Sequence, residues 1–339
     1  MGTVRIIENQ SLRAYNTFGV EAKAQWFAAF NSVDALREIL SQKLPLAFIL
    51  GGGSNLLLTR DVSGLVAKNE ISGIQVESET ADSIIVSAGG GVDWHPFVQW
   101  CVAHRYGGVE NLSLIPGTVG AAPIQNIGAY GVEIKDVFEY LEALKLSTGI
   151  IRTFRAADCR FGYRDSVFKQ ELKGQYCILK VAFRLTKTQP RLHTAYGAIQ
   201  EMLVEMEVPH PDIATLSEAV IRIRNSKLPD PAQLGNAGSF FKNPEVDAAQ
   251  FSSLHQTFPN IPHYSMGEGR QKIPAGWLIE QCGWKGKRSG DAGCYKKQAL
   301  VLVNYGQASG QEILALANAI IASVEAKFGI TLVPEVNLI

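Results

Sequence analysis

Three polar residues, Ser239, Arg164 and Glu335, are candidates for catalysis because of their types and their neighbours in the sequence. Ser239 lies three residues before Lys242 in a glycine-rich stretch, and a nearby lysine can polarise a hydroxyl into a nucleophile or proton donor. Arg164 lies among aromatic residues, and an arginine can bind a carboxylate or phosphate and stabilise a developing oxyanion. Glu335 follows a proline near the C-terminus. The structural alternatives are a turn serine, an Arg164–Asp165 ion pair and an exposed carboxylate.

Two glycine-rich stretches without acidic residues could hold a phosphate. The first is Gly51-Gly52-Gly53-Ser54-Asn55, after an apolar run, and the second covers residues 115–131, which contain no charged residue. Backbone amides can bind a diphosphate, and glycine permits close approach. Neither stretch fits the dinucleotide or P-loop glycine pattern. Each could instead be structural, a tight hairpin or a buried loop, but together they favour a dinucleotide-like ligand.

A cluster of basic residues, Arg222, Arg224 and Lys227, could also meet phosphates. Its alternative is the solvated face of a helix, where charged residues are common. The sequence pattern leaves both readings open.

The composition excludes several classes of protein. The 339 residues are 46% hydrophobic and 19% charged, which is typical of a globular chain of about two domains. The net charge is zero, so no overall field attracts nucleic acid or an acidic membrane. The five cysteines and six histidines form no C-x-x-C or H-E-x-x-H pattern, so we expect reduced thiols and no metal site. No signal peptide or membrane span is predicted, and we expect a cytoplasmic protein.

Helices and strands are predicted in a mixed order that favours an α+β fold. A helix is expected from residue 33, capped by Asn31 or Ser32, and another after Asp93 that ends at 107–108. A capping box at Ser309 and Glu312 predicts a C-terminal helix. Strands are expected at residues 46–50, 83–87, 177–185 and 330–333, a hairpin at 141–154, and a domain boundary at 228–231.

An ordered series of motifs runs through the chain. It consists of Asn16-Thr17-Phe18-Gly19, the stretch 50–55, Glu110-Asn111-Leu112 with 115–117, the stretches 125–131, 159–166, 227–231, 235–244 and 275–279, and Pro334-Glu335-Val336. The series closely resembles the longer branch of the UDP-N-acetylenolpyruvoylglucosamine reductase (MurB) family. The resemblance covers nearly the whole chain.

The resemblance implies a flavoenzyme of peptidoglycan precursor synthesis. It predicts a two-lobed FAD-binding region of the vanillyl-alcohol-oxidase/PCMH type followed by an α+β substrate-binding domain. The expected boundaries are 1–70 and 71–226 for the lobes, and 227–339 for the substrate domain with a C-terminal strand carrying Glu335. The family reduces the enolpyruvyl ether of UDP-N-acetylglucosamine with NADPH. The expected state is a cytoplasmic monomer that binds a nucleotide sugar, with neither nucleic acid nor membrane as partner.

The resemblance also assigns residues to roles. Ser239 matches the proton donor, Arg164 the group that stabilises the enolate, and Glu335 the carboxylate that orients the enolic form; Lys227 or Lys242 would polarise Ser239. Expected substrate contacts are Tyr196, a mobile tyrosine over the diphosphate, with Lys227, Asn243 and Gln298. The expected cofactor-binding residues are Gly51, Gly52, Gly53, Ser54, Asn55, Ile115, Pro116, Gly117, Gly120, Ala121, Ala122, Asn126, Gly128, Gly131 and Arg224.

One departure and two rival functions remain open. Some relatives carry hydroxyls where this chain has Ala121 and Ala122, so backbone amides must contribute more, and we expect weaker or differently tuned FAD binding. A covalent flavin-linked oxidase is one rival, although His95 and His104 lie outside the expected flavin loops. A non-catalytic nucleotide-sugar binding protein is the other, and the presence of Ser239, Arg164 and Glu335 disfavours it.

Overall fold

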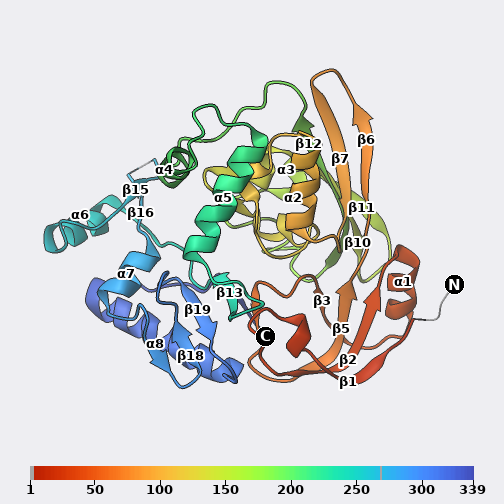
Figure 1. Cartoon of the computed structure of the whole chain (residues 1–339). Helices are drawn as coiled ribbons and strands as arrows, with labels where there is room; N and C mark the ends of the chain where they lie inside the picture. The colour runs from red at the N-terminus through yellow and green to blue at the C-terminus, as the bar shows by residue number, and fades with distance from the viewer. Residues whose placement is uncertain (1–3, 268) are drawn as a thin grey trace. The chain divides into compact units, whose positions relative to one another are not determined.

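The computed structural model describes residues 4–267 and 269–339. The chain forms two compact units (Figure 1). The first unit is built from Met1–Gln10, Ala24–Gly52 and Ser63–Ser226, and the second from Ser11–Lys23, Gly53–Val62 and Lys227–Ile339. Two short N-terminal segments therefore belong to the C-terminal unit. The mixed α+β class predicted from the sequence is confirmed, while the finer division into lobes at residue 70 stays a prediction.

The first unit contains two β-sheets. The smaller has the order β1-β2-β5-β3, formed by β1 (Ile7–Ser11), β2 (Lys23–Phe30), β5 (Val62–Asn69) and β3 (Leu46–Leu50), with β3 parallel to β5. The larger has the order β11-β10-β12-β7-β6, formed by β11 (Ile151–Arg155), β10 (Phe138–Lys145), β12 (Tyr176–Thr186), β7 (Ser83–Gly89) and β6 (Ile74–Glu79). The predicted hairpin at 141–154 is the antiparallel pair of β10 and β11.

Helices cover these sheets and complete the cores. They are α1 (Val33–Ser41), α2 (Trp94–Ala103), α3 (Ala156–Cys159), α4 (Gly197–Glu205) and α5 (Ile213–Lys227). Ser32 caps α1 by accepting a hydrogen bond from the Ala35 amide, as one of the two predicted caps would. Trp94 of α2 packs edge-on against Phe183 of β12, with ring centroids 5.7 Å apart. This packing sets α2 on the larger sheet, beside the loops that follow it (Figure 1).

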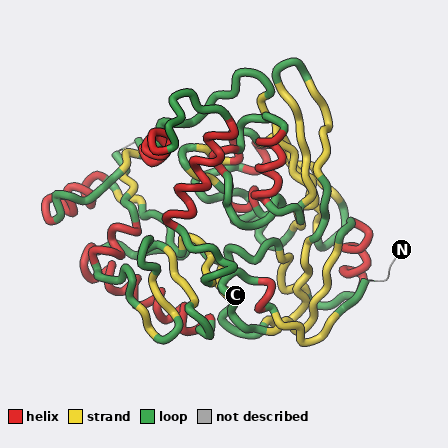
Figure 2. Tube along the Cα trace, viewed as in Figure 1, coloured by secondary structure: helices red, strands yellow, loops and turns green. Residues whose placement is uncertain are grey.

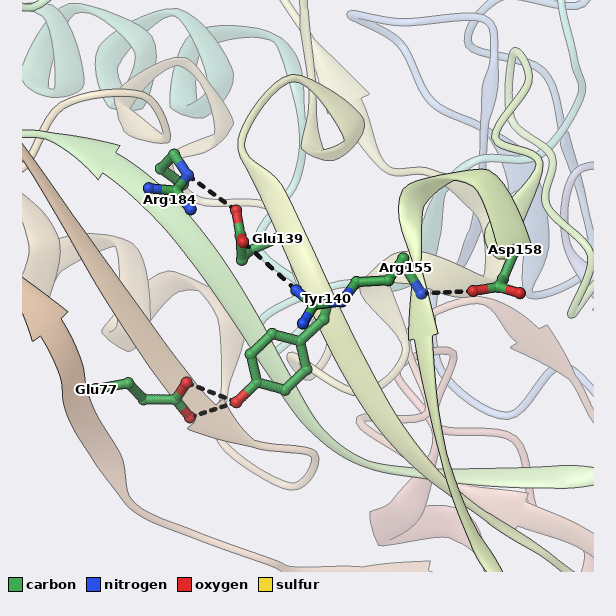
Figure 3. Close-up of polar contacts among 6 residues, drawn as sticks. All are labelled: Glu77, Glu139, Tyr140, Arg155, Asp158 and Arg184. Carbon is green, nitrogen blue, oxygen red and sulfur yellow. Dashed lines mark hydrogen bonds and ion pairs between the residues drawn. The ribbon is translucent and has the colours of Figure 1, made fainter.

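A charged network crosses the larger sheet (Figure 3). Glu139 of β10 pairs with Arg184 of β12 at 2.9 Å and with Arg155 of β11 at 3.5 Å. The Tyr140 hydroxyl donates to the Glu77 carboxylate of β6 at 2.7 Å. These contacts link β10 to its neighbours β11 and β12 and, across β12 and β7, to β6, and such cross-strand contacts help to stabilise a sheet.

The segment between α2 and β10 is mostly loop and short turns (Figure 2). It contains the 3-10 turns η2 (Glu110–Leu112), η3 (Ala122–Gln125) and η4 (Ile134–Asp136) and the two-residue strands β8 (Gly128–Ala129) and β9 (Val132–Glu133). The uncharged stretch 115–131 lies within this segment of loop and short turns. Helix α2 ends at Ala103, however, earlier than the predicted stop at Gly107-Gly108, because the backbone turns into the left-handed region at Arg105 (φ 59°).

The second unit is organised around a sheet of order β13-β19-β18-β17, formed by β13 (Gly235–Ser239), β19 (Val301–Asn304), β18 (Ala292–Cys294) and β17 (Arg288–Ser289). Helices α7 (Ala275–Gln281) and α8 (Gly310–Phe328) pack in its core. The Ser309–Glu312 capping box and the left-handed Gly329 that closes α8 are both present, as predicted.

Smaller elements complete this unit. They are η1 (Arg13–Tyr15), α6 (Ala248–Thr257), the sheet of β14 (Glu245–Val246), β16 (Gln271–Lys272) and β15 (Tyr264–Ser265), and the parallel pair β20 (Asn337–Leu338) and β4 (Leu56–Leu57). The strand predicted at 330–333 is absent from the described structure, so that prediction is wrong. Pro334 forms only an isolated bridge with Phe241, because proline has no backbone N–H with which to extend a ladder.

Candidate active site

In the first unit, the two predicted phosphate loops come together. A Cβ placed on Gly52 would lie 2.8 Å from the Gly117 Cα, and one on Gly51 would lie 2.8 Å from the Thr118 hydroxyl oxygen and 3.6 Å from the Ala121 Cβ. The two backbones can approach this closely only because Gly51 and Gly52 lack side chains. We call Gly51, Gly52, Gly117, Thr118 and Ala121 the glycine cradle.

One buried hydroxyl in the glycine cradle has no internal partner. The Thr118 side chain is 2% exposed, and among the described residues its oxygen makes no hydrogen bond. A buried polar atom of this kind is costly unless a ligand or water satisfies it. A close-packed, neutral glycine cradle with an unsatisfied hydroxyl therefore fits the diphosphate of a dinucleotide cofactor.

Backbone hydrogen bonds hold the second loop against the rest of the first unit. The Val119 amide donates to the Val92 carbonyl at 2.8 Å, and the Gly120 amide donates to the Gly90 carbonyl at 2.9 Å. The Ala121 and Ala122 amides donate to the Thr118 carbonyl at 3.0 and 3.2 Å. These two amides are engaged inside the turn, so neither is available as a further hydrogen-bond donor to a cofactor.

The basic residues of α5 separate into two environments. Arg222 pairs with Glu218 one turn away at 2.7 Å on the exposed face, so it follows the solvated-face alternative. Arg224 lies on another face, where its Nε donates to the Leu114 carbonyl at 3.3 Å. Burial and the nearby charge of Arg164 lower the pKa of Arg224. Two guanidinium groups thus lie near each other in the first unit, which favours binding of an anion.

Arg164 is presented by a tight turn. The Gly162 amide donates to the Asp165 carbonyl at 3.0 Å, and Arg164 takes a left-handed backbone conformation with φ 52°. The Asp165 carboxylate binds the Gln170 side chain at 2.9 Å, and no Arg164–Asp165 ion pair occurs in the described residues. The structural alternative for Arg164 is therefore not realised.

Asn126 supports this turn from within the scaffold. Its side-chain amide donates to the Gly162 carbonyl at 2.9 Å and to Glu133 at 3.0 Å, while its oxygen accepts from the Lys135 amide at 3.1 Å. The residue was expected to bind cofactor, yet its polar groups already link the second loop to the turn that carries Arg164.

The remaining expected residues of the second loop are placed along its course. Ile115 and Pro116 lead into Gly117, Gly128 lies in β8, and Gly131 is exposed with φ 83°. Tyr196 is 47% exposed at the N-terminus of α4 and packs edge-on against Tyr130, with ring centroids 5.4 Å apart. Burial raises the pKa of Tyr130, which also interacts with Arg224. Tyr196 therefore lies close to the arginine pair.

His95, which lies outside both glycine-rich stretches, contacts the start of the second loop. Its Nδ1 accepts a hydrogen bond from the Leu114 amide at 2.9 Å, and Leu114 has a left-handed backbone with φ 60°. An accepting Nδ1 requires a neutral imidazole, and burial lowers the pKa of His95. His95 thus binds the amide of Leu114, and Arg224 binds its carbonyl.

In the second unit, the rest of the first phosphate loop meets the C-terminal segment. Gly53 has φ 64°, and a Cβ there would lie 2.0 Å from the Tyr15 carbonyl oxygen, so only glycine fits. The half-buried Ser54 follows it, and the Asn55 side chain donates to the Glu335 carbonyl at 3.4 Å. The loop therefore positions the backbone of Glu335.

Ser239 and Glu335 are brought together through the backbone. Ser239 ends β13 opposite Val301 and is exposed, whereas the next residue, Phe240, is buried. The Glu335 amide donates to the Phe240 carbonyl at 2.8 Å. Within the described residues, neither Lys227 nor Lys242 forms a hydrogen bond with the Ser239 hydroxyl.

Asn243 and Gln298 lie on either side of the start of α7. The Asn243 oxygen accepts from the Ala275 amide at 2.9 Å, and a Cβ on Gly276 would lie 3.0 Å from the Gln298 side-chain oxygen. The Asn243 amide group remains available as a donor. Lys227 is exposed. No cluster of metal ligands occurs in the described part of the chain, and no helix there is long and apolar enough to cross a bilayer.

Two family models match this chain. A family model described as an FAD binding domain matches residues 31–155, which include both phosphate loops. A second, described as the C-terminal domain of UDP-N-acetylenolpyruvoylglucosamine reductase, matches residues 230–339, which include Ser239 and Glu335. The FAD binding domain and the reductase domain thus define an FAD-dependent oxidoreductase.

Full-length relatives identify the family. The UDP-N-acetylenolpyruvoylglucosamine reductase of Flavobacterium johnsoniae is 49% identical over 99% of this chain and 100% of its own length. That of Pseudomonas aeruginosa is 50% identical over 99% of both chains. The crystal structure of the Thermus caldophilus enzyme shares the fold, with a TM-score of 0.66 at 23% identity over 99% of this chain and 98% of that chain. The chain belongs to the UDP-N-acetylenolpyruvoylglucosamine reductase (MurB) family.

Proposed function

We propose that this protein reduces the enolpyruvyl ether of UDP-N-acetylglucosamine to UDP-N-acetylmuramate, with NADPH as reductant, in peptidoglycan precursor synthesis. The observation that carries the proposal is the match of about half of all residues to reductases of that name across nearly the whole chain. The protein would act in the cytoplasm as a monomer on a nucleotide sugar.

The residues of the first unit fit the cofactor. The glycine cradle and the Thr118 hydroxyl suit the diphosphate of FAD, and Arg224 supplies positive charge near the start of the second loop. When bound, FAD supplies the two-electron carrier between NADPH and the enolpyruvyl group. The protein's part is to hold that carrier and to handle charge and protons at the substrate.

Arg164 is the candidate for charge stabilisation. Hydride addition to the terminal vinyl carbon leaves negative charge on the neighbouring carbon and its carboxylate, and a guanidinium stabilises such a charge. The left-handed turn presents Arg164, and the contacts of Asn126 fix that turn. Tyr196, next to Tyr130, would close over the diphosphate of the substrate.

Ser239 is the candidate proton donor. Its hydroxyl would give a proton to the carbon that carries the carboxylate, and the resulting alkoxide would be reprotonated from solvent. Glu335, whose backbone is tied to Phe240 and Asn55, would orient the enolic form. Lys227, Asn243 and Gln298 would contact the nucleotide sugar.

The products test this proposal. Purified protein with FAD, unlabelled NADPH and the enolpyruvyl substrate in D₂O should give UDP-N-acetylmuramate. Deuterium should appear at the carbon next to the carboxylate, as judged by NMR and mass spectrometry, because that carbon takes its proton from a solvent-exchangeable donor. A product without deuterium at that carbon would contradict protonation there. Oxidation of NADPH only in air, with hydrogen peroxide and no reduced sugar, would overturn the proposal in favour of an oxidase.

A further inference from the structure

Lys68 contacts the first phosphate loop from the adjacent strand. It lies in β5 opposite Leu50, the last residue of β3, and its Nζ donates to the Gly51 carbonyl at 2.7 Å. The side chain is half-buried. Burial lowers the pKa of Lys68, while the carboxylates of Glu70 and Asp93 act in the opposite direction. The hydrogen bond and the partial burial therefore fix the Lys68 side chain in one position.

The contact with Lys68 fixes the direction of one amide in the glycine cradle. The peptide between Gly51 and Gly52 is trans, so its C=O and N–H point in opposite directions. Because the Gly51 carbonyl faces Lys68, the Gly52 N–H faces away from it. A carbonyl oxygen turned toward an anion would repel it, whereas an N–H attracts it.

Lys68 also brings positive charge to two loops that carry none of their own. Neither the stretch 51–55 nor the stretch 115–131 carries a charged residue, so their own contribution to binding a diphosphate is limited to dipoles. Asp93 lies near enough to affect the titration of Lys68, and its carboxylate would oppose an anion at the glycine cradle. The ammonium of Lys68 offsets that charge.

We propose that Lys68 is the cationic anchor of the cofactor-binding loop: it holds the Gly51 carbonyl, directs the Gly52 N–H toward the cofactor diphosphate and supplies the positive charge that the two loops lack. Lys68 is thus a positioning residue. The inference rests on the proposed assignment of the glycine cradle to the FAD diphosphate.

FAD binding as a function of salt tests the role of Lys68. The dissociation constant of FAD from the holoprotein would be measured by equilibrium ultrafiltration at several KCl concentrations. Lys68→Met should weaken binding about tenfold and flatten the salt dependence, because a charge-assisted contact is lost. Lys68→Arg should keep both within about threefold of the unmutated protein. Lys173→Met, which removes an exposed lysine of the same unit, is the matched control and should change neither.

A second control separates the two hypotheses. Gly52→Ala should weaken FAD binding by disturbing the glycine cradle itself. If Gly52→Ala weakens binding but Lys68→Met leaves both affinity and salt dependence unchanged, the role of Lys68 is refuted while the glycine cradle stands. If neither changes binding, the assignment of the glycine cradle fails, and the role of Lys68 fails with it. If Lys68→Met weakens FAD binding but the salt dependence of binding matches that of the unmutated protein, Lys68 has a purely structural role and the proposal is overturned.

Discussion

Replacing Gly52 by alanine places a methyl group where the glycine cradle has no room. The added Cβ would lie 2.8 Å from the Gly117 Cα, which is a backbone atom and cannot move aside by changing rotamer. Ordinary contact begins near 3.4 Å, so the two loops must separate by roughly 0.6 Å. Overpacking of this kind costs about 1–3 kcal/mol.

The consequence should appear in cofactor affinity. If the whole cost falls on the cofactor-bound form, the dissociation constant of FAD rises about 5- to 150-fold. Ultrafiltration of the holoprotein with fluorescence detection of released FAD measures this directly. Gly197→Ala is the matched control, because a Cβ on Gly197 meets nothing within 4 Å. An FAD affinity of Gly52→Ala within twofold of the control would refute the close approach of the two loops as the basis of cofactor binding.

Three further perturbations follow from the structure. His95 accepts a hydrogen bond as a neutral group, and its pKa in the folded protein is lowered. Its contribution to the free energy of unfolding should therefore be full above about pH 6.5 and disappear as the pH falls through the folded pKa. A His95→Gln variant should lose this pH dependence when unfolding by denaturant is measured. Ser239→Ala should slow transfer to the enolpyruvyl substrate at least about 100-fold and leave flavin reduction by NADPH unchanged in stopped-flow absorbance, and equal slowing of both steps would contradict a proton-donor role. Gly310→Ala would put a Cβ 1.8 Å from the Leu58 carbonyl oxygen and should lower the unfolding free energy by more than about 3 kcal/mol; an unchanged Tm would refute that contact.

The sequence predicts the features that depend on local patterns. Ser32 and the Ser309–Glu312 capping box mark helix starts because their side chains satisfy amides within the next turn. The glycine and charge content of the two loops indicates phosphate binding, since that signal is also local. At residues 330–333, apolar character alone predicted a strand. None forms there, and Pro334 cannot extend a ladder because it has no backbone N–H.

Features that depend on tertiary contacts could not be predicted. Nothing in the spacing of Arg222 and Arg224 says which one faces solvent, because that depends on what packs against α5. His95 and Lys68 lie 19 and 17 residues from the residues they contact, and each looks like an ordinary residue of its own helix or strand. Their roles appear only once parallel pairing and the packing of α2 bring them to Gly51 and Leu114.

We propose that this flavoprotein passes hydride to an enolpyruvyl ether. Flavin absorbance, followed in the absence of oxygen while one equivalent of NADPH and then UDP-N-acetylglucosamine enolpyruvate are added, reports that transfer. NADPH should bleach the oxidised flavin band, and the sugar nucleotide should restore it without air. A flavin that bleaches but stays reduced until oxygen enters would contradict the claim.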